Sequence, residues 1–265
     1  LNADIRSTVV YDAGTDAYYF TSKGGTFYSV QVTGDRKLTN KWSVNLANGV
    51  GGVPMSTSTP VVYNGRAYIG VSGAGQFTPY SGHNITVIDV VARRIAYRVE
   101  TQGYPQTSGL MTTGYDDGVY VYFMDNYTPG VMRVIHDAPG QTALEGGVTE
   151  EFTSDKGVSG TYTDCAPVVF TPRGSLAQYC IGSPVTDEYG TLYFKNDSGN
   201  LIALTSAVRE LKVAEKPEIA RTEDGQWEVT GGKIVAVLAN GLERDITALV
   251  EYRDDGSGGV EAVYT

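Results

Sequence analysis

Short runs of alternating apolar and polar residues, separated by glycine-rich turns, recur along most of the chain. The clearest example is 183–204, SPVTDEYGTLYFKNDSGNLIAL, in which 191–194 and 201–204 are strand-like. Turn residues at 187–190 and 196–199 flank the first strand, and their Gly and Asn residues readily adopt positive φ. The pattern predicts a short antiparallel meander over this stretch.

Three weaker copies of this meander precede it, at 9–32, 59–90 and 111–136. Each is followed by one more predicted strand with a large aromatic residue, and these aromatics are 55 residues apart: Trp42, Tyr97 and Phe152. Four strands per repeat at a period of about 50 residues favour propeller blades over solenoid coils. A pair of β-sandwiches is the alternative all-β fold.

We therefore predict an all-β chain whose first part, 1–207, is a propeller-like array of about four four-stranded blades. Trp42, Tyr97 and Phe152 are expected to dock one blade on the next, since each holds the same place in its own repeat. No segment shows a convincing helical stripe.

The repeat resembles that of pyrroloquinoline-quinone (PQQ)-type β-propellers. The stretch 183–204 matches closely and 59–70 matches the first half, whereas 7–46 and 109–153 match in outline. The resemblance covers roughly 1–213 and implies a quinoprotein-alcohol-dehydrogenase-like fold, in a class that also includes non-enzymatic bacterial envelope proteins. Such rings commonly have about seven or eight blades, so we expect either blades outside this sequence or a homo-oligomer that completes the ring.

The interval between the third and fourth copies is longer than the others and contains both cysteines, Cys165 and Cys180. The segments 165–170 and 178–181 look like two strands joined by a turn at 171–174. Cysteines that face each other on a hairpin can meet the Cα separation of a disulfide. The alternative is two small buried thiols.

The pattern changes after residue 207, where short alternating strands follow one another and Asn240-Gly241 is a hairpin signal. The stretch 232–241 followed by 245–247 resembles bacterial immunoglobulin-like (Ig-like) surface modules. The resemblance implies a small sandwich-like module over 208–265, and the alternative is a β extension packed on the blades.

The net charge of −10 argues against nucleic acid as a partner, because a phosphate backbone requires a basic surface. No apolar run approaches the ~18 residues of a membrane helix, so we expect no membrane insertion in this segment. Together with the resemblances, these features predict an extracellular or cell-surface bacterial protein.

Catalytic chemistry finds little support in the sequence. The two histidines, His83 and His136, have no partner at metal-ligand spacing, and neither a nucleophile elbow nor a phosphate-binding loop is present. The quinone enzymes that the repeat resembles hold their cofactor with a calcium ion, a stacking tryptophan and often an adjacent-cysteine disulfide. Because no residue here can be matched to those roles, we predict no catalytic residue, metal or cofactor.

The long loop 72–84, SGAGQFTPYSGHN, interrupts a blade hairpin and carries Phe77, Tyr80 and His83. The loop 125–130 occupies the corresponding hairpin of the next blade and carries Tyr127. Long loops in compact domains are often functional. If both loops lie on one face, these four residues form a recognition patch for sugars or peptides; the alternative is loop padding.

We therefore expect a non-catalytic binding or structural module that acts through protein or carbohydrate interaction. One alternative is a fragment of a quinoprotein oxidoreductase whose active centre lies partly in blades outside this sequence. The other is an envelope assembly scaffold that binds strand-like peptides along exposed blade edges.

Overall fold

The computed structural model is all-β, and it describes residues 3–48, 54–73, 82–113, 118–153 and 159–264. In these ranges the regular structure consists of twenty-four strands and two short 3-10 helices, η1 (Gly174–Leu176) and η2 (Thr247–Leu249). Within these described ranges, no helix has the length and apolarity to cross a membrane. The chain divides into two compact units, Leu1–Val185 with Tyr193–Ile202, and Thr186–Leu192 with Ala203–Thr265.

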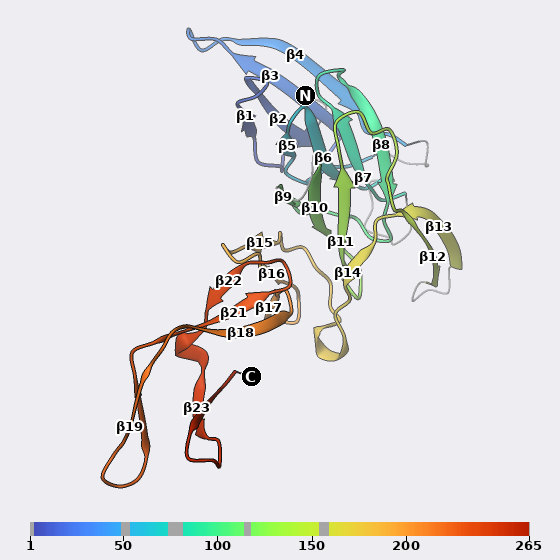
Figure 1. Ribbon diagram of the computed structural model, residues 1–265. Helices are drawn as coiled ribbons and strands as arrows, with labels where there is room; N and C mark the ends of the chain where they lie inside the picture. Colours follow the sequence, from blue (N-terminus) through green and yellow to red (C-terminus); the bar gives the residue numbers. More distant parts are fainter. Residues whose placement is uncertain (1–2, 49–53, 74–81, 114–117, 154–158, 265) are drawn as a thin grey trace. The chain divides into compact units, whose positions relative to one another are not determined.

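The first two sheets are four-stranded antiparallel meanders, as the sequence pattern predicts (Figure 1). Blade 1 has the strand order β1-β2-β3-β4 and blade 2 the order β5-β6-β7-β8. The strands of blade 1 are β1 (Val10–Asp12), β2 (Ala17–Ser22), β3 (Thr26–Val32) and β4 (Leu38–Asn45). Those of blade 2 are β5 (Val61–Tyr63), β6 (Arg66–Val71), β7 (Asn84–Asp89) and β8 (Arg94–Glu100).

Blade 3 keeps the meander but takes its last strand from further along the chain. Its order is β9-β10-β11-β14, with β9 (Leu110–Thr112), β10 (Val119–Met124), β11 (Met132–Asp137) and β14 (Val168–Phe170). The strands β12 (Val148–Thr153) and β13 (Ser159–Cys165) pair only with each other in the described structure. The inserted residues between the third and fourth repeats therefore form a separate hairpin.

The fourth sheet is smaller than predicted. It has three strands, β15 (Val185–Thr186), β16 (Leu192–Lys195) and β17 (Leu201–Leu204), rather than four. Its turns follow the sequence prediction, since Gly190 and Gly199 have φ of +79° and need no Cβ there. No sheet closes on itself among the described strands, and the array is a row of separate blades.

The blades pack face to face through side chains that alternate along each strand. One buried cluster joins Tyr19 and Phe27 of blade 1 to Ala67 and Ile69 of blade 2. A second joins the opposite face of blade 2 to blade 3, and its members include Tyr68, Val87, Tyr97, Val121 and Phe123. Blade 2 is therefore covered on both faces, and all six residues of β6 are buried.

A repeated hydrogen-bond pattern links equivalent positions just before the first strand of successive blades. The Thr8 amide donates to Thr59 Oγ1 at 3.0 Å, and Ser108 Oγ donates to the Thr59 carbonyl at 3.2 Å. The Ser108 amide in turn donates to Ser183 Oγ at 3.2 Å. Each of the four positions lies two residues before the first strand of its sheet, so the structure places the sheets side by side in chain order.

The second unit contains a three-stranded sheet in the order β18-β21-β22 and two further hairpins. Its strands are β18 (Val208–Glu215), β19 (Glu218–Arg221), β20 (Trp227–Thr230), β21 (Lys233–Leu238), β22 (Glu243–Asp245), β23 (Glu251–Asp254) and β24 (Val260–Val263). Asn240-Gly241 joins β21 to β22 as predicted, with Gly241 at φ +85°. Ile234, Ala236, Leu238 and Ile246 form its small core.

Candidate functional site

The loops between the second and third strands of neighbouring blades are bonded to a shared segment. The Thr101 amide donates to the His83 carbonyl, at the end of the β6–β7 loop, with an N–O distance of 3.0 Å. Two residues on, Gly103 lies against the β10–β11 loop so closely that an added Cβ would meet the Asn126 carbonyl oxygen at 2.5 Å. The described end of the β6–β7 loop and the β10–β11 loop therefore both contact the segment 101–103.

The same surface extends to the blades on either side. The side-chain amide of Asn48, which follows blade 1, donates to the Gly82 carbonyl at 2.8 Å. On the other side the Gly130 amide donates to the Gln178 carbonyl, and the Asp197 amide in the β16–β17 turn donates to the Tyr179 carbonyl, both at 3.0 Å. We call this surface the loop end; it consists of residues 82–83, 101–104, 126–130 and 178–180.

The predicted recognition residues occupy different environments in this surface. Phe77 and Tyr80 lie outside the described residues. His83 is fully buried and its ring stacks on Tyr104 with centroids 6.0 Å apart, so it packs inside the loop end and is not exposed on it. Tyr127 is half-buried in the loop that leaves β10.

Sequence reasoning missed two tyrosines of the loop end. Tyr104 is 1% exposed, and its hydroxyl accepts the Thr57 amide at 2.6 Å, which fixes the segment that leaves β8. Burial raises the Tyr104 pKa to about 12. Tyr179 is half-buried, and burial raises its pKa while a side-chain hydrogen bond with Asn126 partly opposes that rise. Tyr179 was overlooked because 178–181 was assigned to a strand, whereas it is a loop here.

A buried acidic residue joins blades 2 and 3. Asp137, at the end of β11, accepts both Nε and Nη2 of Arg66 at 3.0 Å. The Tyr68 and Tyr97 hydroxyls each donate to the same carboxylate at 2.6 Å. Burial and the Asp137 charge raise the pKa of both tyrosines far above the usual range, so both hydroxyls stay protonated as donors. This four-residue network is a blade-docking contact.

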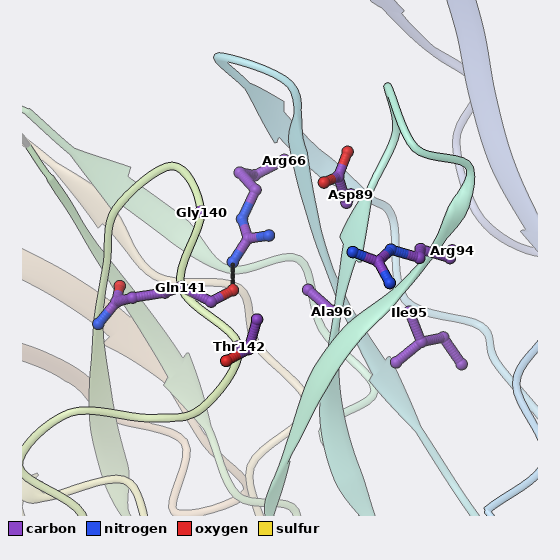
Figure 2. Close-up of a pocket in the computed structure, with 8 residues that line it drawn as sticks. All are labelled: Arg66, Asp89, Arg94, Ile95, Ala96, Gly140, Gln141 and Thr142. Carbon is purple, nitrogen blue, oxygen red and sulfur yellow. Dashed lines mark hydrogen bonds between the residues drawn. The ribbon is translucent and has the colours of Figure 1, made fainter.

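A small cavity lies beside this network (Figure 2). It has a volume of about 120 Å³ and is bounded by Arg66, Asp89, Arg94 and Gln141, among others. Arg66 donates to the Gln141 carbonyl at 2.7 Å, and Figure 2 shows Arg94 extending toward the same space from the start of β8. Ligand pockets typically span about 300–1,000 Å³. A cavity of this size suits a few water molecules and is smaller than an ordinary ligand pocket.

A second buried ion-pair cluster stabilises the β12–β13 insertion. Arg133 of β11 donates to Asp125 at 2.7 Å and makes a two-point contact with Glu150 of β12 at 2.9 and 2.7 Å. Burial raises the Asp125 pKa to about 6, against the lowering effect of Arg133, and nearby Glu150 adds to the rise. In this cluster the single guanidinium of Arg133 therefore pairs with the two carboxyl groups of Asp125 and Glu150.

The three aromatics predicted to dock the blades divide into two kinds. Trp42 packs beside Tyr19 and Phe27 between blades 1 and 2, and Tyr97 belongs to the cluster between blades 2 and 3. Phe152 instead stacks on Tyr162 within the β12–β13 hairpin, with centroids 4.8 Å apart. The prediction for Phe152 was wrong about its place in the repeat, because β14 and not β12 completes blade 3.

The two cysteines are free, buried thiols in the structure and are not joined as a disulfide. The hairpin on which the disulfide prediction depended does not form, because β14 pairs with β11 and 178–181 is a loop. The Cys180 Sγ lies 3.5 Å from the Lys195 carbonyl oxygen. Burial raises the pKa of Cys165 to about 12 and that of Cys180 to about 11, which keeps both thiols protonated.

Metal or quinone binding has no obvious ligand set in the described ranges. There, no three or more His, Cys, Asp or Glu side chains gather as a metal site requires. The two most buried carboxylates, Asp125 and Asp137, are already in contact with Arg133 and Arg66. A calcium ion at either position would have to displace a guanidinium, so these residues do not fit that ion.

No protein-family model matches the chain, and no curated protein sequence matches it. Three solved structures with partial similarity are BamB from Moraxella catarrhalis, the WD40 β-propeller domain of Doa1, and a quinohemoprotein alcohol dehydrogenase from Pseudomonas putida HK5. Their identities are 15%, 12% and 12%, and their TM-scores 0.43, 0.33 and 0.34. The alignments cover 91%, 89% and 86% of this chain.

The chain spans 62% of the BamB chain, 76% of the Doa1 domain and 44% of the dehydrogenase. At these identities and TM-scores the similarity carries no argument about activity or ligand. The fold follows from the sheets themselves, which are successive antiparallel meanders stacked face to face. This chain is an all-β protein built of propeller-like blades.

Proposed function

We propose that this chain is a non-catalytic binding module of the bacterial cell surface, which recognises a protein or carbohydrate ligand at its loop end. The observation that carries the proposal is the hydrogen-bonded continuity of the loop end across neighbouring blades. Binding residues commonly lie on loops that a rigid scaffold positions. The stacked blades with their buried ion pairs supply that scaffold.

The loop end has the side chains that such recognition requires. Tyr127 and Tyr179 are half-buried aromatic residues, and the buried Asn126 directly precedes Tyr127 in the same loop. Aromatic rings with a polar edge bind sugar faces and peptide side chains through both packing and hydrogen bonding. The cis peptide bond at Thr128-Pro129 lies in the same loop as Tyr127.

The test measures binding of the purified chain to a glycan microarray and to an array of immobilised peptides. The variants are Tyr127→Ala and Tyr179→Ala, and the control is Tyr252→Ala, a half-buried tyrosine of β23 in the other unit. We expect the first two to reduce the signal at least tenfold and the control to preserve it. Equal binding by the wild type and all three variants would show that the loop end is not the binding site. Digestion of the protein when intact cells are treated with protease would test its placement on the cell surface.

A second candidate function is binding of a strand-like peptide, and β18 favours it. All eight residues of β18 are exposed, and in the described structure it is an edge strand that pairs only with β21. An edge strand presents unpaired backbone groups to another chain. Replacement of Leu211 by proline would block added backbone pairing there, so unchanged peptide binding by this variant would contradict the idea.

The quinoprotein alternative has its own measurement. Reconstitution of the chain with PQQ and calcium would give a quinone absorbance shift and a higher melting temperature if the chain held part of such a centre. We expect neither, because the buried carboxylates are occupied by arginines. A saturable absorbance change would overturn the non-catalytic proposal.

A further inference from the structure

Three charged side chains form a row across three strands at one end of blade 2. Arg66, at the start of β6, lies directly opposite Asp89 at the end of β7. Asp89 in turn lies directly opposite Arg94 at the start of β8. Residues directly opposite one another on antiparallel strands share a face of the sheet. We call these three residues the charged row, and all three line the cavity of about 120 Å³ beside the Asp137 network.

The central carboxylate of the charged row is not paired with either arginine. Within the described ranges, Asp89 forms no ion pair with Arg66 or Arg94. Its Oδ1 instead accepts the Val91 and Ala92 amides at 3.1 and 2.7 Å, which fixes the turn between β7 and β8. No described residue donates a hydrogen bond to its other oxygen, Oδ2. Asp89 is half-buried, so it can offer this oxygen to a ligand that carries a positive charge.

Arg66 is held rigidly and still has donors to spare. A guanidinium has five N–H groups. The Nε and Nη2 groups donate to Asp137, and Nη2 also donates to the Gln141 carbonyl at 2.7 Å. In the part of the chain that the structure describes, these contacts leave the two N–H groups of Nη1 without an acceptor. Asp137 also neutralises the charge of Arg66, so Nη1 adds fixed donors to the cavity and little net charge.

Arg94 supplies the uncompensated positive charge of the cavity. It is exposed, and its side chain has no hydrogen-bond or ion-pair partner among the described residues. Figure 2 shows its guanidinium and that of Arg66 reaching toward the same space from two sides. Ile95 and Ala96 also line this space and give it an apolar wall. The cavity therefore combines one free positive group, one free negative oxygen and a small apolar surface.

We propose that the charged row binds a small free α-amino acid of the size of glycine or alanine. The carboxylate of the ligand lies between Arg94 and Nη1 of Arg66, and its ammonium group lies against Oδ2 of Asp89. Because Asp137 neutralises Arg66, the two charges that remain are one positive and one negative. A zwitterion matches both, whereas a simple anion would face the Asp89 carboxylate. A guanidinium also matches a carboxylate geometrically, through two parallel hydrogen bonds.

The volume of the cavity limits the side chain of the ligand. A protein cavity of about 150 Å³ admits benzene, which has six non-hydrogen atoms. A cavity of about 120 Å³ therefore has room for glycine or alanine but not for an aromatic amino acid. β7 (Asn84–Asp89) begins beside the loop end and finishes at the charged row, so this site and the loop end lie at opposite ends of blade 2. Binding here is thus independent of recognition at the loop end.

Isothermal titration calorimetry of the purified chain with L-alanine tests the proposal. We expect saturable heat at millimolar concentration with one site per chain. Arg94→Gln and Asp89→Asn should each weaken alanine binding by about tenfold or more, since each removes one charge-assisted contact. Arg94 is exposed, and asparagine in place of Asp89 keeps an oxygen for the two turn amides, so both variants should fold, as circular dichroism can verify. Arg6→Gln changes an exposed arginine outside the charged row and should bind alanine like the wild type.

Fragments of the ligand distinguish a zwitterion site from a simple ion site. Acetate carries the carboxylate alone and methylammonium the positive charge alone, so each should bind at least about tenfold more weakly than alanine. Asp89→Asn should leave acetate binding no weaker than in the wild type, because acetate does not use that carboxylate. L-Phenylalanine should give no saturable heat. The proposal would be overturned if alanine gave no saturable heat, if acetate or inorganic phosphate bound as tightly as alanine, or if Arg94→Gln bound alanine like Arg6→Gln.

Discussion

Asp137 of β11 and Arg66 of β6 form a two-point ion pair between neighbouring blades, with both N–O distances at 3.0 Å. The side chains are 0% and 5% exposed, respectively, and two tyrosine hydroxyls complete the acceptor capacity of the carboxylate. Burial alone would lower the Arg66 pKa, but its hydrogen bonds and attraction to Asp137 raise it above its ordinary value. The contacts with Asp137 therefore keep the buried Arg66 guanidinium charged.

Removing one partner of this pair should be costly. We expect Asp137→Ala to lower the free energy of unfolding by about 3–5 kcal/mol, because it leaves the Arg66 charge buried without compensation. Urea unfolding at neutral pH measures the change. Asp35→Ala, which removes the exposed partner of Lys37, is the control and should change the stability little. Equal effects of the two substitutions would contradict a docking role for Asp137.

Close packing of blade 2 on the segment that follows it predicts a strong effect of Gly70→Ala. An added Cβ at Gly70 would lie 1.6 Å from the Pro105 carbonyl oxygen, so the backbone of one segment must move. We expect a loss of at least about 1–3 kcal/mol, as for other overpacked sites. Gly34→Ala, where nothing lies within 4 Å, should be nearly neutral in the same thermal melts. A neutral Gly70→Ala would show that the two segments are not in contact.

The two aromatics Tyr97 and Phe152 should differ in their contribution to stability. Tyr97→Ala opens the cluster between blades 2 and 3 and loses a hydrogen bond to Asp137, so we expect a cost of about 3–5 kcal/mol. Phe152→Ala removes one ring stack in a two-stranded hairpin and should cost about 1 kcal/mol. Chemical denaturation compares them, and a reversed order would restore Phe152 as a docking residue.

We predict that Asp125 makes the free energy of unfolding depend on pH. Its pKa is about 6 in the folded chain, above the ordinary aspartate value of 3.8, so the folded state binds more protons between these two values. The stability that this group contributes is therefore complete below about pH 4 and falls as the pH rises through about 6. Asp125→Asn cannot ionise. The difference in melting temperature between wild type and this variant should change over that window, and a constant difference would contradict the raised pKa.

The two thiols should be inert in the native protein. Because burial raises both thiol pKa values to about 11–12, almost no thiolate is present at neutral pH. We expect little reaction with a thiol-specific disulfide reagent under native conditions and two reactive thiols per chain in denaturant. If fewer than two thiols per chain react in denaturant without added reductant, the result would contradict free thiols and support the Cys165–Cys180 disulfide.

The recurrence of strand, turn and strand was available from the sequence because each signal is local. Alternating apolar residues specify which side of a strand is buried, and Gly190, Gly199 and Gly241 occupy turn positions that require positive φ. The sequence also predicted that Trp42 and Tyr97 are equivalent. In the structure each lies opposite the third strand of its own blade, in the same register. These features depend on neighbours within one hairpin or one blade.

What only the tertiary structure decided was which segments pair over long separations and which polar groups become buried. No local feature of the sequence distinguishes β12 from β14 as the last strand of blade 3. Because β14 takes that place, Phe152 of β12 does not dock blades and the predicted cysteine hairpin does not form. Likewise, Arg66 and Asp137 are 71 residues apart, and their pairing follows from stacking blade 2 on blade 3. Local patterns specify strands because backbone geometry is local, whereas the pairing of buried charges depends on which faces meet in space.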